Sequence, residues 1–385
     1  MERVEVAVVG GGLLGSAAAR SLGARGVATV LLEQFEPGHA RGSSHGVTRI
    51  FRLSYPDPGY VRMAVRAGEA WARLEREAGE RLLLRTGGLD AGPGAAGCAA
   101  ALAECGVDHE WLAAPQIGAR FPQIAADPGE RMLYQPDSGV CLADRTVAAL
   151  QRLAQRDGVQ VRPRTQVLRI DTGGGRAVLH TAGGDICARV AVVAAGPWLA
   201  GLLAGAVARV PPLAATLQQV RYFAPAGPGA ASWPTLIEWP SAAPSWYVVP
   251  RAGGAPGVKV AAHVPGREVD PRDGPFGRID PALEEAAASY VRSRLPGLRP
   301  AGFAPETCLY TMTADEDFVL DREGPVVVAG GCSGHAFKFG PLLGEVLAGL
   351  ALGEDTGLPG GRFSLSRPAL AGGPQAAPPG TRPAR

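Results

Sequence analysis

The chain has 385 residues, 46% of them hydrophobic, and a formal net charge of +2 at pH 7. This length allows two lobes with sizeable cores. The small net charge and the lack of Lys/Arg runs with interleaved aromatic residues argue against nucleic-acid binding. No apolar stretch reaches membrane-spanning length without an interrupting glycine or charge, so we expect no membrane span.

The N-terminus and the cysteines bear on the cellular compartment. The first predicted strand begins directly after residues 1–3, which leaves no room for a signal peptide, so we expect a cytoplasmic protein. The six cysteines show no paired metal-ligand spacing, and we therefore expect neither a metal site nor, in the cytosol, disulfides. They are Cys98, Cys105, Cys141, Cys187, Cys308 and Cys332.

A glycine-rich loop follows the first predicted strand. Residues 4–9 are mostly apolar and β-branched, which predicts a buried parallel strand. Gly10, Gly12 and Gly15 then occupy the positions of a G-x-G-x-x-G motif. The first glycine permits a tight turn, the second lets a pyrophosphate approach the backbone, and the third lets the next helix pack closely on the strand.

A helix and a second strand complete this unit. The helix is predicted from Leu14 to about Gly23, and the N–H groups of Leu13 and Leu14 at its start would face the phosphates. A second apolar strand at 28–32 ends at Glu33, about twenty residues past the loop, where an acid holds the adenosine ribose. The order of these parts predicts a unit that binds a dinucleotide, and the acid at Glu33 argues against a ligand with a 2′-phosphate on its adenosine ribose.

The chain up to residue 210 is predicted to mix helices with strands. A loop-rich stretch at 36–60 comes first. Helices are expected at 60–78, 95–105 and 144–156. Strands are expected at 82–89, 159–161, 166–170, 177–180 and 190–195, and the last of them runs into Gly196 as a strand does before a phosphate-side turn.

From residue 211 to 262 the pattern changes to short strands separated by Pro and Gly, which predicts an antiparallel sheet. Its strands are expected at 220–223, 235–239, 246–249 and 258–260. A helix at 281–295, a strand at 326–329, a glycine-rich loop and a final helix from about Pro341 follow. The tail after Arg367 is rich in Pro, Ala, Gly and Arg and is predicted to be disordered.

Three segments resemble one known family: 42–52 (GSSHGVTRIFR), 307–313 (TCLYTMT) and 332–339 (CSGHAFKF). Together they resemble monomeric sarcosine oxidase and N-methyltryptophan oxidase, among the D-amino-acid-oxidase-type FAD-dependent oxidoreductases, and the resemblance runs from about Val4 to Leu352. That family oxidises a secondary or cyclic amino acid to the imine with a covalent FAD, which O2 reoxidises to give H2O2. The resemblance implies FAD, a small-molecule amino-acid substrate, O2 and a monomer.

The predicted fold class is α/β (α+β), with a Rossmann-type FAD-binding domain interleaved with an antiparallel-sheet substrate domain. Nucleotide-type segments stand at the start, middle and end of the chain, and sheet-rich segments lie between them. We assign 1–80, 145–213 and 303–366 to the FAD-binding domain. We assign 81–144 and 214–302 to the substrate domain, and 367–385 to a disordered tail.

The resemblance implies roles for five reactive side chains. Cys308 would bond the flavin, and Lys259 would lie near flavin N5, where a buried ammonium lowers the cost of reducing O2. His263 would line the substrate cavity. Arg52 and Lys338 would grip the substrate carboxylate, since a guanidinium offers paired donors and an ammonium adds a second charge. This grip would place the reacting C–H over the flavin.

Further residues are implied beside the flavin and the substrate. His45 and Arg49 would be basic groups near the flavin ring, where a cation stabilises the reduced anionic flavin. Tyr310 would contact the substrate. Other residues expected to contact the cofactor are Ser43, Ser44, Thr48, Gly334, His335, Phe337 and Lys338.

Ordinary structural roles stay open for these residues on sequence alone. Arg49 and Arg52 are by default solvated arginines of a basic loop, and Lys259 an exposed strand lysine. A lone cysteine such as Cys308 is more often inert core than a cofactor bond. His335 could equally orient its own loop through backbone hydrogen bonds.

Two departures from the family pattern leave sarcosine itself open as the substrate. Val47 stands where the resemblance leads us to expect an acid, and Ala336 replaces a glycine. The stretch between Pro211 and Trp246 should shape the side-chain pocket. Four aromatic residues suit either an aromatic-walled cavity or the core: Trp233, Trp239, Trp246 and Tyr247.

The leading functional hypothesis is an oxidase of an N-methyl or cyclic secondary α-amino acid. A second hypothesis is a biosynthetic oxidase of an unusual cyclic imino acid, acting in one or two rounds. A third is an FAD dehydrogenase with an acceptor other than O2, and a fourth is a catalytically silent FAD-binding protein. The set Arg52, Lys259, Cys308 and Lys338 argues against the last two.

Overall fold

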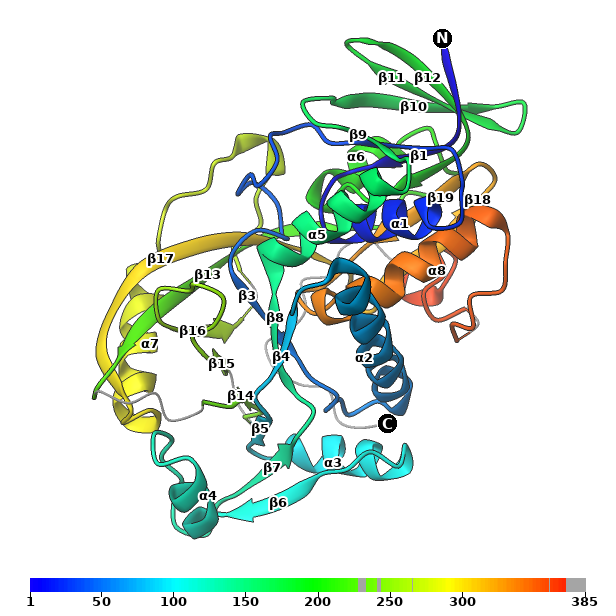
Figure 1. The fold of residues 1–385 in the computed structure, drawn as a ribbon. Helices are drawn as coiled ribbons and strands as arrows, with labels where there is room; N and C mark the ends of the chain where they lie inside the picture. The colour runs from blue at the N-terminus through cyan, green and yellow to red at the C-terminus, as the bar shows by residue number, and fades with distance from the viewer. Residues whose placement is uncertain (228–232, 241–243, 265, 360, 372–385) are drawn as a thin grey trace.

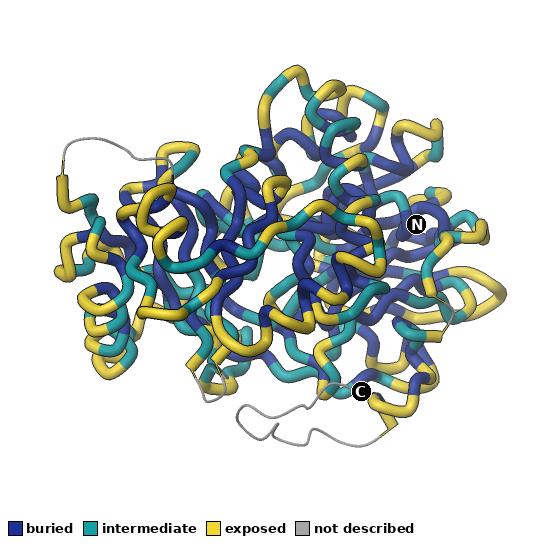
Figure 2. Tube along the Cα trace, turned by 90° about the horizontal axis from the view of Figure 1, so that it is seen from below, coloured by how far each residue is buried: buried dark blue, intermediate teal, exposed yellow. Residues whose placement is uncertain are grey.

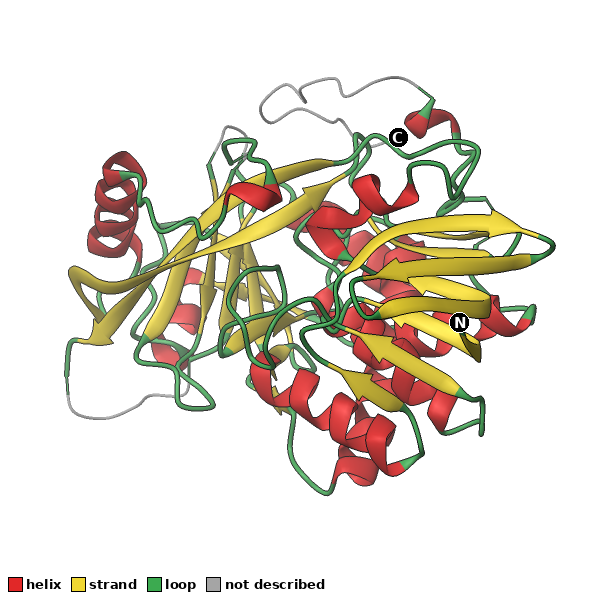
Figure 3. Ribbon diagram, turned by 90° about the horizontal axis from the view of Figure 1, so that it is seen from above, coloured by secondary structure: helices red, strands yellow, loops and turns green. Residues whose placement is uncertain are grey.

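The computed structural model describes residues 1–227, 233–240, 244–264, 266–359 and 361–371. Its strands form two eight-stranded sheets and one three-stranded sheet. The two large sheets define a first and a second lobe, which lie side by side (Figures 1 and 3). The first lobe carries most of the helices, while the second is formed largely of strands.

The first lobe is built around β1 (Glu2–Val9), which pairs in parallel with β2 (Thr29–Leu32) on one side and β12 (Gly184–Val193) on the other. The far edge of β12 pairs with β11 at its start and with β19 at its end. The remaining strands of this sheet are β9 (Gln160–Arg162), β10 (Val167–Gly173), β11 (Arg176–Thr181), β18 (Val319–Glu323) and β19 (Val326–Gly330).

Both faces of this first sheet are covered. Alternation along β1 sends Val6 and Val8 into one apolar cluster, and Ala7 and Val9 into another. The cluster around Val6 and Val8 includes side chains of five helices: α1 (Leu13–Gly23), α2 (Pro58–Ala78), α3 (Ala95–Glu104), α5 (Ala143–Arg156) and α8 (Gly340–Leu352). Helix α1 contacts both α5 and α8. The opposite face packs against the short α6 (Leu199–Leu203).

Helix α2 shows why these residues form a helix there. Asp57 caps its first turn by accepting a hydrogen bond from Tyr60 N–H at 3.0 Å, and Pro58 starts it with a suitable φ. Gly79, with φ of +68°, ends it in the left-handed conformation. Its apolar residues recur at helical spacing and are buried; they include Tyr60, Ala64, Ala67, Trp71 and Leu74.

The second lobe has the strand order β17-β13-β16-β15-β14-β5-β7-β6 and is mainly antiparallel. Its strands are β5 (Gly88–Ala91), β6 (Glu110–Ala113), β7 (Arg131–Gln135), β13 (Ala214–Pro225), β14 (Thr235–Glu238), β15 (Ser245–Val249), β16 (Val258–His263) and β17 (Leu298–Met312). Helix α7 (Pro281–Arg294) packs on this sheet through Ala287 and Val291. The lobe also carries α3 (Ala95–Glu104) and α4 (Ala114–Arg120).

The third sheet consists of β3 (Thr48–Phe51), β8 (Gly139–Leu142) and β4 (Leu83–Arg85). These strands run between the two large sheets in Figure 1. The buried backbone, dark in Figure 2, passes through both lobes, and exposed segments lie mainly at loops and edges. Among the described helices, none is long and apolar enough to cross a bilayer.

The predicted α/β fold class is confirmed, but some predicted elements were wrong. The single strand expected at 82–89 is two strands, β4 and β5, in different sheets. The chain turns between them at Gly87, whose φ is +71°. A Cβ at Gly87 would lie 2.3 Å from the Tyr134 hydroxyl, so the ring packs directly on the turn. The expected loop at 36–60 also contains β3.

Two further differences concern the last third of the chain. The predicted domain boundary at 303 falls inside β17, whose pairing with β13 continues to Met312, so the second sheet extends further than expected. The predicted disorder was wrong at its start, because Arg367 and Leu370 are buried and a 3-10 turn forms at Pro368–Leu370. The rest of that tail, 372–385, lies outside the described residues.

Candidate active site

The glycine loop between β1 and α1 has the close contacts expected of a dinucleotide cradle. Gly10 has φ of +103°, and a Cβ there would lie 2.5 Å from the Ala194 carbonyl oxygen. A Cβ at Gly15 would lie 1.9 Å from the Gly10 carbonyl oxygen. Neither position can take a side chain without moving the backbone. A Cβ at Gly12 would meet Ser44 Oγ at 3.0 Å, so the loop of Ser44 already lies against the cradle.

Glu33 stands at the end of β2, beside this loop. Its carboxylate accepts hydrogen bonds from Gly11 N–H at 2.7 Å and Phe35 N–H at 2.8 Å. Burial alone raises the pKa of Glu33, but its contact with His39 and the two backbone bonds lower that pKa overall. Glu33 is therefore charged at neutral pH, as a ribose-binding acid should be.

The loop at 43–48 is fixed by Arg49 of β3. Its guanidinium donates to three backbone carbonyls: Thr48 at 2.8 Å, His45 at 2.7 Å and Ser43 at 3.0 Å. Ser44 Oγ accepts from Leu13 N–H at 3.0 Å, which joins the loop to the start of α1. Arg49 is thus a half-buried residue that anchors the loop, and not the solvated arginine that its sequence context alone allowed.

Lys259 lies on β16, an inner strand of the second sheet between β13 and β15, and is 4% exposed. Its Nζ donates to the Thr48 carbonyl at 3.0 Å and lies 5.6 Å from the centre of the Tyr222 ring. Burial, reinforced by the Arg49 charge, lowers the pKa of Lys259 to about 7. The alternative of an exposed strand lysine is excluded.

Two polar atoms next to Lys259 lack partners. Within the described part of the chain, His45 Nε2 and Thr48 Oγ1 are buried without a hydrogen bond. Buried polar atoms are nearly always satisfied, so these two indicate a place for a polar ligand. Burial, with the charges of Arg49 and Lys259, lowers the pKa of His45 to about 4, which keeps its ring neutral.

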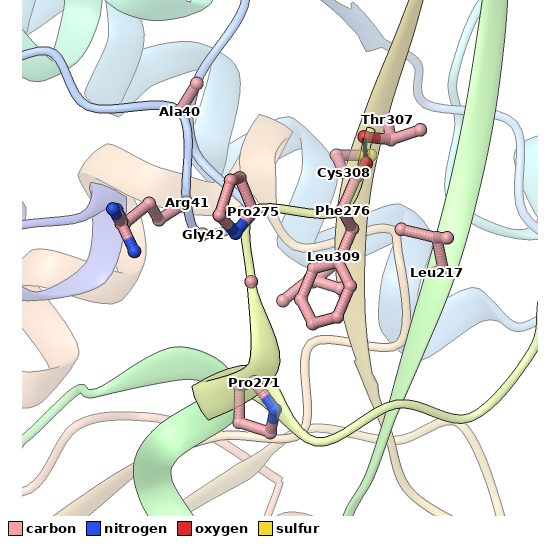
Figure 4. A pocket seen from close by; sticks show the side chains of 11 residues that line it. Ala40, Arg41, Gly42, Leu217, Pro271, Pro275, Phe276, Thr307, Cys308 and Leu309 are labelled. Carbon is pink, nitrogen blue, oxygen red and sulfur yellow. Dashed lines mark hydrogen bonds between the residues drawn. The ribbon is translucent and has the colours of Figure 1, made fainter. Parts of the chain in front are cut away.

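Cys308 lies on β17, opposite Gln218 of β13. It is half-buried and lines a small pocket with Gly42 and Phe276 (Figure 4). The neighbouring Thr307 hydroxyl donates to the Phe276 carbonyl and so fixes one wall of this pocket. Burial raises the pKa of the Cys308 thiol, so it is a neutral thiol at neutral pH. All six cysteines are unpaired.

Arg52 and Lys338 converge on one side chain, Tyr55, which sequence reasoning missed. Lys338 is 4% exposed and donates to the Tyr55 hydroxyl at 2.8 Å and to the His335 carbonyl at 2.6 Å. The Arg52 guanidinium lies 4.2 Å from the centre of the Tyr55 ring and 4.9 Å from that of Trp239. Burial and the charge of Arg52 hold the pKa of Lys338 well below its ordinary value.

Asp90 is the second residue that the sequence did not single out. It is 2% exposed on β5 and accepts a hydrogen bond from Trp239 Nε1 at 2.8 Å. Burial raises the pKa of Asp90, and the nearby Arg52 charge opposes this rise. Asp90 therefore holds the indole of Trp239 against Arg52.

His335 and Gly334 lie where the last segment of the resemblance meets β17. His335 contacts the Tyr55 hydroxyl through Nδ1 at 3.3 Å and the Glu316 carbonyl through Nε2 at 3.0 Å. His335 therefore orients its loop, which was the alternative left open by the sequence. It also contacts Tyr55, the residue on which Arg52 and Lys338 converge. Gly334, with φ of +77°, leaves room for Tyr310, since a Cβ there would lie 2.3 Å from that ring.

His263 lies near the Arg52 and Lys338 side chains, and Phe337 lies near Arg49. The His263 ring centre lies 6.0 Å from that of Tyr310. His263 is itself exposed, and desolvation by the surrounding protein, with the charges of Arg52 and Lys338, lowers its pKa to about 4. The Phe337 ring centre lies 5.7 Å from the Arg49 guanidinium.

The aromatic residues of the second lobe divide between core and site. Trp246 stacks on Tyr290 of α7 with ring centres 4.8 Å apart, and Trp233 belongs to the same buried cluster, so both are core. Trp239 contacts Arg52 and belongs to the site. Tyr247 is hydrogen-bonded to Tyr310. Residues 228–232 and 241–243 of the expected pocket-forming stretch lie outside the described residues.

The two family departures also have definite places. Val47 packs against the buried cluster that contains Val220 and Tyr222, and Ala336 is buried in the core of the first lobe. Neither position carries a polar group toward the site. The charged hydrogen-bond donors of the site are therefore Arg49, Lys259, Arg52 and Lys338, and the histidines beside them are neutral.

These residues fit FAD. The glycine cradle and the charged Glu33 suit its adenosine diphosphate part, and the orphaned atoms of His45 and Thr48 suit a polar ring system beside Cys308. The fold and the site thus define an FAD-dependent oxidoreductase. The family described as FAD dependent oxidoreductase (DAO) matches residues 5–350, and the chain belongs to it.

Particular relatives extend over nearly the whole chain. It is 33% identical over 382 residues to monomeric sarcosine oxidase of Bacillus sp. (strain B-0618), covering 95% of this chain and 96% of the relative. It is 34% identical over 358 residues to peroxisomal sarcosine oxidase of Mus musculus, covering 90% and 91%. Among solved structures it is similar to the open form of NikD, an unusual amino acid oxidase essential for nikkomycin biosynthesis. That match has a TM-score of 0.85 and 27% identity, and covers 94% of this chain and 98% of NikD.

Proposed function

We propose that this protein oxidises a secondary α-amino acid, N-methyl or cyclic, to the imine and passes the electrons to O2 to give H2O2. The relatives named as sarcosine oxidases and the likeness to the amino acid oxidase NikD support this activity. The observation that carries it is the convergence of Arg52 and Lys338 on Tyr55. The half-buried Arg52 guanidinium and the buried Lys338 amine meet at one place, and a substrate carboxylate supplies the anion that balances them.

Arg52 and Lys338 bind and orient the substrate. The Arg52 Nη1 donates to the Ser54 carbonyl at 2.7 Å, which holds the guanidinium in place for the carboxylate. Lys338 adds a donor fixed by Tyr55. Bound FAD supplies the acceptor for the electrons of the C–H bond. Orientation of this kind contributes several kcal/mol to catalysis when the reacting atoms are held in place.

Lys259 serves the oxygen half-reaction. Its ammonium is buried, held by the Thr48 carbonyl, and adjacent to the orphaned His45 Nε2. A fixed positive charge in such a water-poor place stabilises the negative charge that O2 acquires on reduction. We propose that Lys259, His45, Arg49 and His263 form the catalytic group, and that Tyr310 lines the substrate position with Arg52 and Lys338.

The cofactor is proposed to lie along the glycine loop and the segments 43–48 and 334–338, with Cys308 bonding the flavin. The residues that would hold it are Gly10, Gly12, Leu13, Leu14, Gly15, Glu33, Ser43, Ser44, Thr48, Gly334, His335, Phe337 and Lys338. We further propose that the enzyme works as a cytoplasmic monomer. The domain division is proposed as predicted, apart from the boundary that β17 crosses.

The test is a screen for H2O2 release with N-methyl and cyclic amino acids, each beside its own methyl ester. The cyclic set includes unusual imino acids, because the second hypothesis from the sequence is a biosynthetic oxidase of such a compound. The proposal predicts H2O2 from some free acids and far less from the matching esters. Equal rates on acid and ester would contradict the carboxylate clamp. Substrate turnover without H2O2 would instead favour a dehydrogenase.

A further inference from the structure

Glu306 is a carboxylate beside the proposed oxygen site that no motif pointed to. It lies on β17, two residues before Cys308, so both side chains project from the same face of the strand. It is half-buried, and its Oε2 accepts a hydrogen bond from the Tyr222 hydroxyl at 3.0 Å. A carboxylate in such a place is costly unless it has a defined partner.

Tyr222 connects Glu306 to Lys259. Tyr222 of β13 and Lys259 of β16 are directly paired across the two strands. The Tyr222 ring is fully buried and its centre lies 5.6 Å from Lys259 Nζ. An ammonium at this distance is attracted to an aromatic ring. The hydrogen bond to the carboxylate makes the phenol more electron-rich, which strengthens that attraction.

The charges around Lys259 leave Glu306 as its main compensating charge. The titratable and charged groups that face it come from β3 and the preceding loop, β13, β17 and α5. They are His45, Arg49, Asp144, Tyr222, Glu306 and Cys308. At neutral pH the cysteine, tyrosine and histidine are neutral. Asp144 is exposed, so solvent screens its charge.

We propose that Glu306 is a positioning residue for the oxygen half-reaction, which acts through Tyr222 to keep Lys259 in place and positively charged. This inference rests on the proposed role of Lys259. Burial and Arg49 lower the pKa of Lys259 to about 7, and the Glu306 charge opposes that change. With its pKa lowered to about 7, Lys259 responds to the loss of a single neighbouring charge within the ordinary pH range.

The sign of the pH effect follows. Lys259 is cationic below its pKa, so reoxidation by O2 is fast at low pH and slows as pH rises through that pKa. Removing the Glu306 charge lowers the pKa of Lys259 further. The descending part of the pH profile then moves to lower pH, by on the order of one pH unit for one buried charge at this range.

The experiment is stopped-flow reoxidation of substrate-reduced holoenzyme by O2 as a function of pH, for wild type, Glu306→Gln and Tyr222→Phe. We expect the descending limb to shift down in Glu306→Gln and, by less, in Tyr222→Phe. Anaerobic reduction by substrate should change little. The visible spectrum of the resting oxidised enzyme, titrated without turnover, should show the same shifted midpoint. Glu345→Gln, on α8 and paired with Arg73, is the matched control and should keep the wild-type midpoint.

Lys259→Met separates this inference from the proposed function. If Lys259→Met reoxidises at the wild-type rate, the proposed oxygen role fails, and this inference fails with it. If Lys259→Met is slow but Glu306→Gln keeps the wild-type midpoint, the inference alone is overturned. In the Lys259→Met background, Glu306→Gln should cause no further pH shift. If Glu306→Gln does not fold with flavin, the test rests on Tyr222→Phe. An unchanged midpoint of the pH profile of reoxidation in Tyr222→Phe then overturns the inference.

Discussion

Replacing Lys338 by methionine tests the carboxylate clamp while keeping an unbranched side chain of similar length. In the wild type, Lys338 Nζ is held by the Tyr55 hydroxyl at 2.8 Å and the His335 carbonyl at 2.6 Å, next to the Arg52 charge. A charged hydrogen bond to a carboxylate in a closed site contributes about 2 to 3 kcal/mol. We therefore expect kcat/KM for the free amino acid to fall by roughly 30-fold to 150-fold.

The assay compares each substrate with its methyl ester in both proteins. The ester has no anionic group for the ammonium to hold, so Lys338→Met should change its rate little. The ratio of kcat/KM for acid over ester should therefore collapse in the variant. If the ratio stays at its wild-type value while both rates fall together, Lys338 is only a structural residue and the clamp is refuted.

Four further results are expected. Cys308→Ala should release its flavin on acid precipitation, whereas the wild-type pellet stays yellow; a colourless wild-type pellet would contradict the covalent bond. Gly15→Ala should purify with little flavin absorbance, because its Cβ would lie 1.9 Å from a backbone oxygen. Arg367→Met should lower the free energy of unfolding in urea by about 3 to 5 kcal/mol, since Arg367 is only 7% exposed and its guanidinium binds Asp315 and the carbonyls of Asp317 and Phe318. Binding of a carboxylate inhibitor should take up a proton, measured by calorimetry in several buffers, because the anion raises the lowered pKa of Lys338; Lys338→Met should abolish this uptake.

Local features of the sequence predicted the cofactor end of the molecule well. The glycine spacing and the acid at Glu33 follow from requirements within about twenty residues of chain, so their geometry is encoded nearby. The structure confirms the close contacts of Gly10 and Gly15. The resemblance then pointed to Arg52 and Lys338, which the structure brings together on Tyr55.

Contacts between strands that are distant in the sequence could not be predicted from the sequence. Asp90 on β5 meets Trp239 after β14, and Glu306 on β17 meets Tyr222 on β13. Each looks like an ordinary polar residue in its own segment, and only the strand order of the second sheet gives it a partner. Strand β17 itself was missed because glycine and proline interrupt its first half, and its long pairing with β13 overrides that local signal.

The central claim is that a secondary amino acid reduces the flavin of this protein and that O2 then reoxidises it. The most direct measurement mixes oxidised holoenzyme with such an amino acid without oxygen, follows the visible flavin absorbance, and then admits O2 while H2O2 is counted. The account predicts bleaching by the amino acid and rapid recovery with O2, with H2O2 formed in proportion to the flavin recovered. Failure of every secondary amino acid to bleach the flavin, or bleaching that O2 does not reverse, would contradict it.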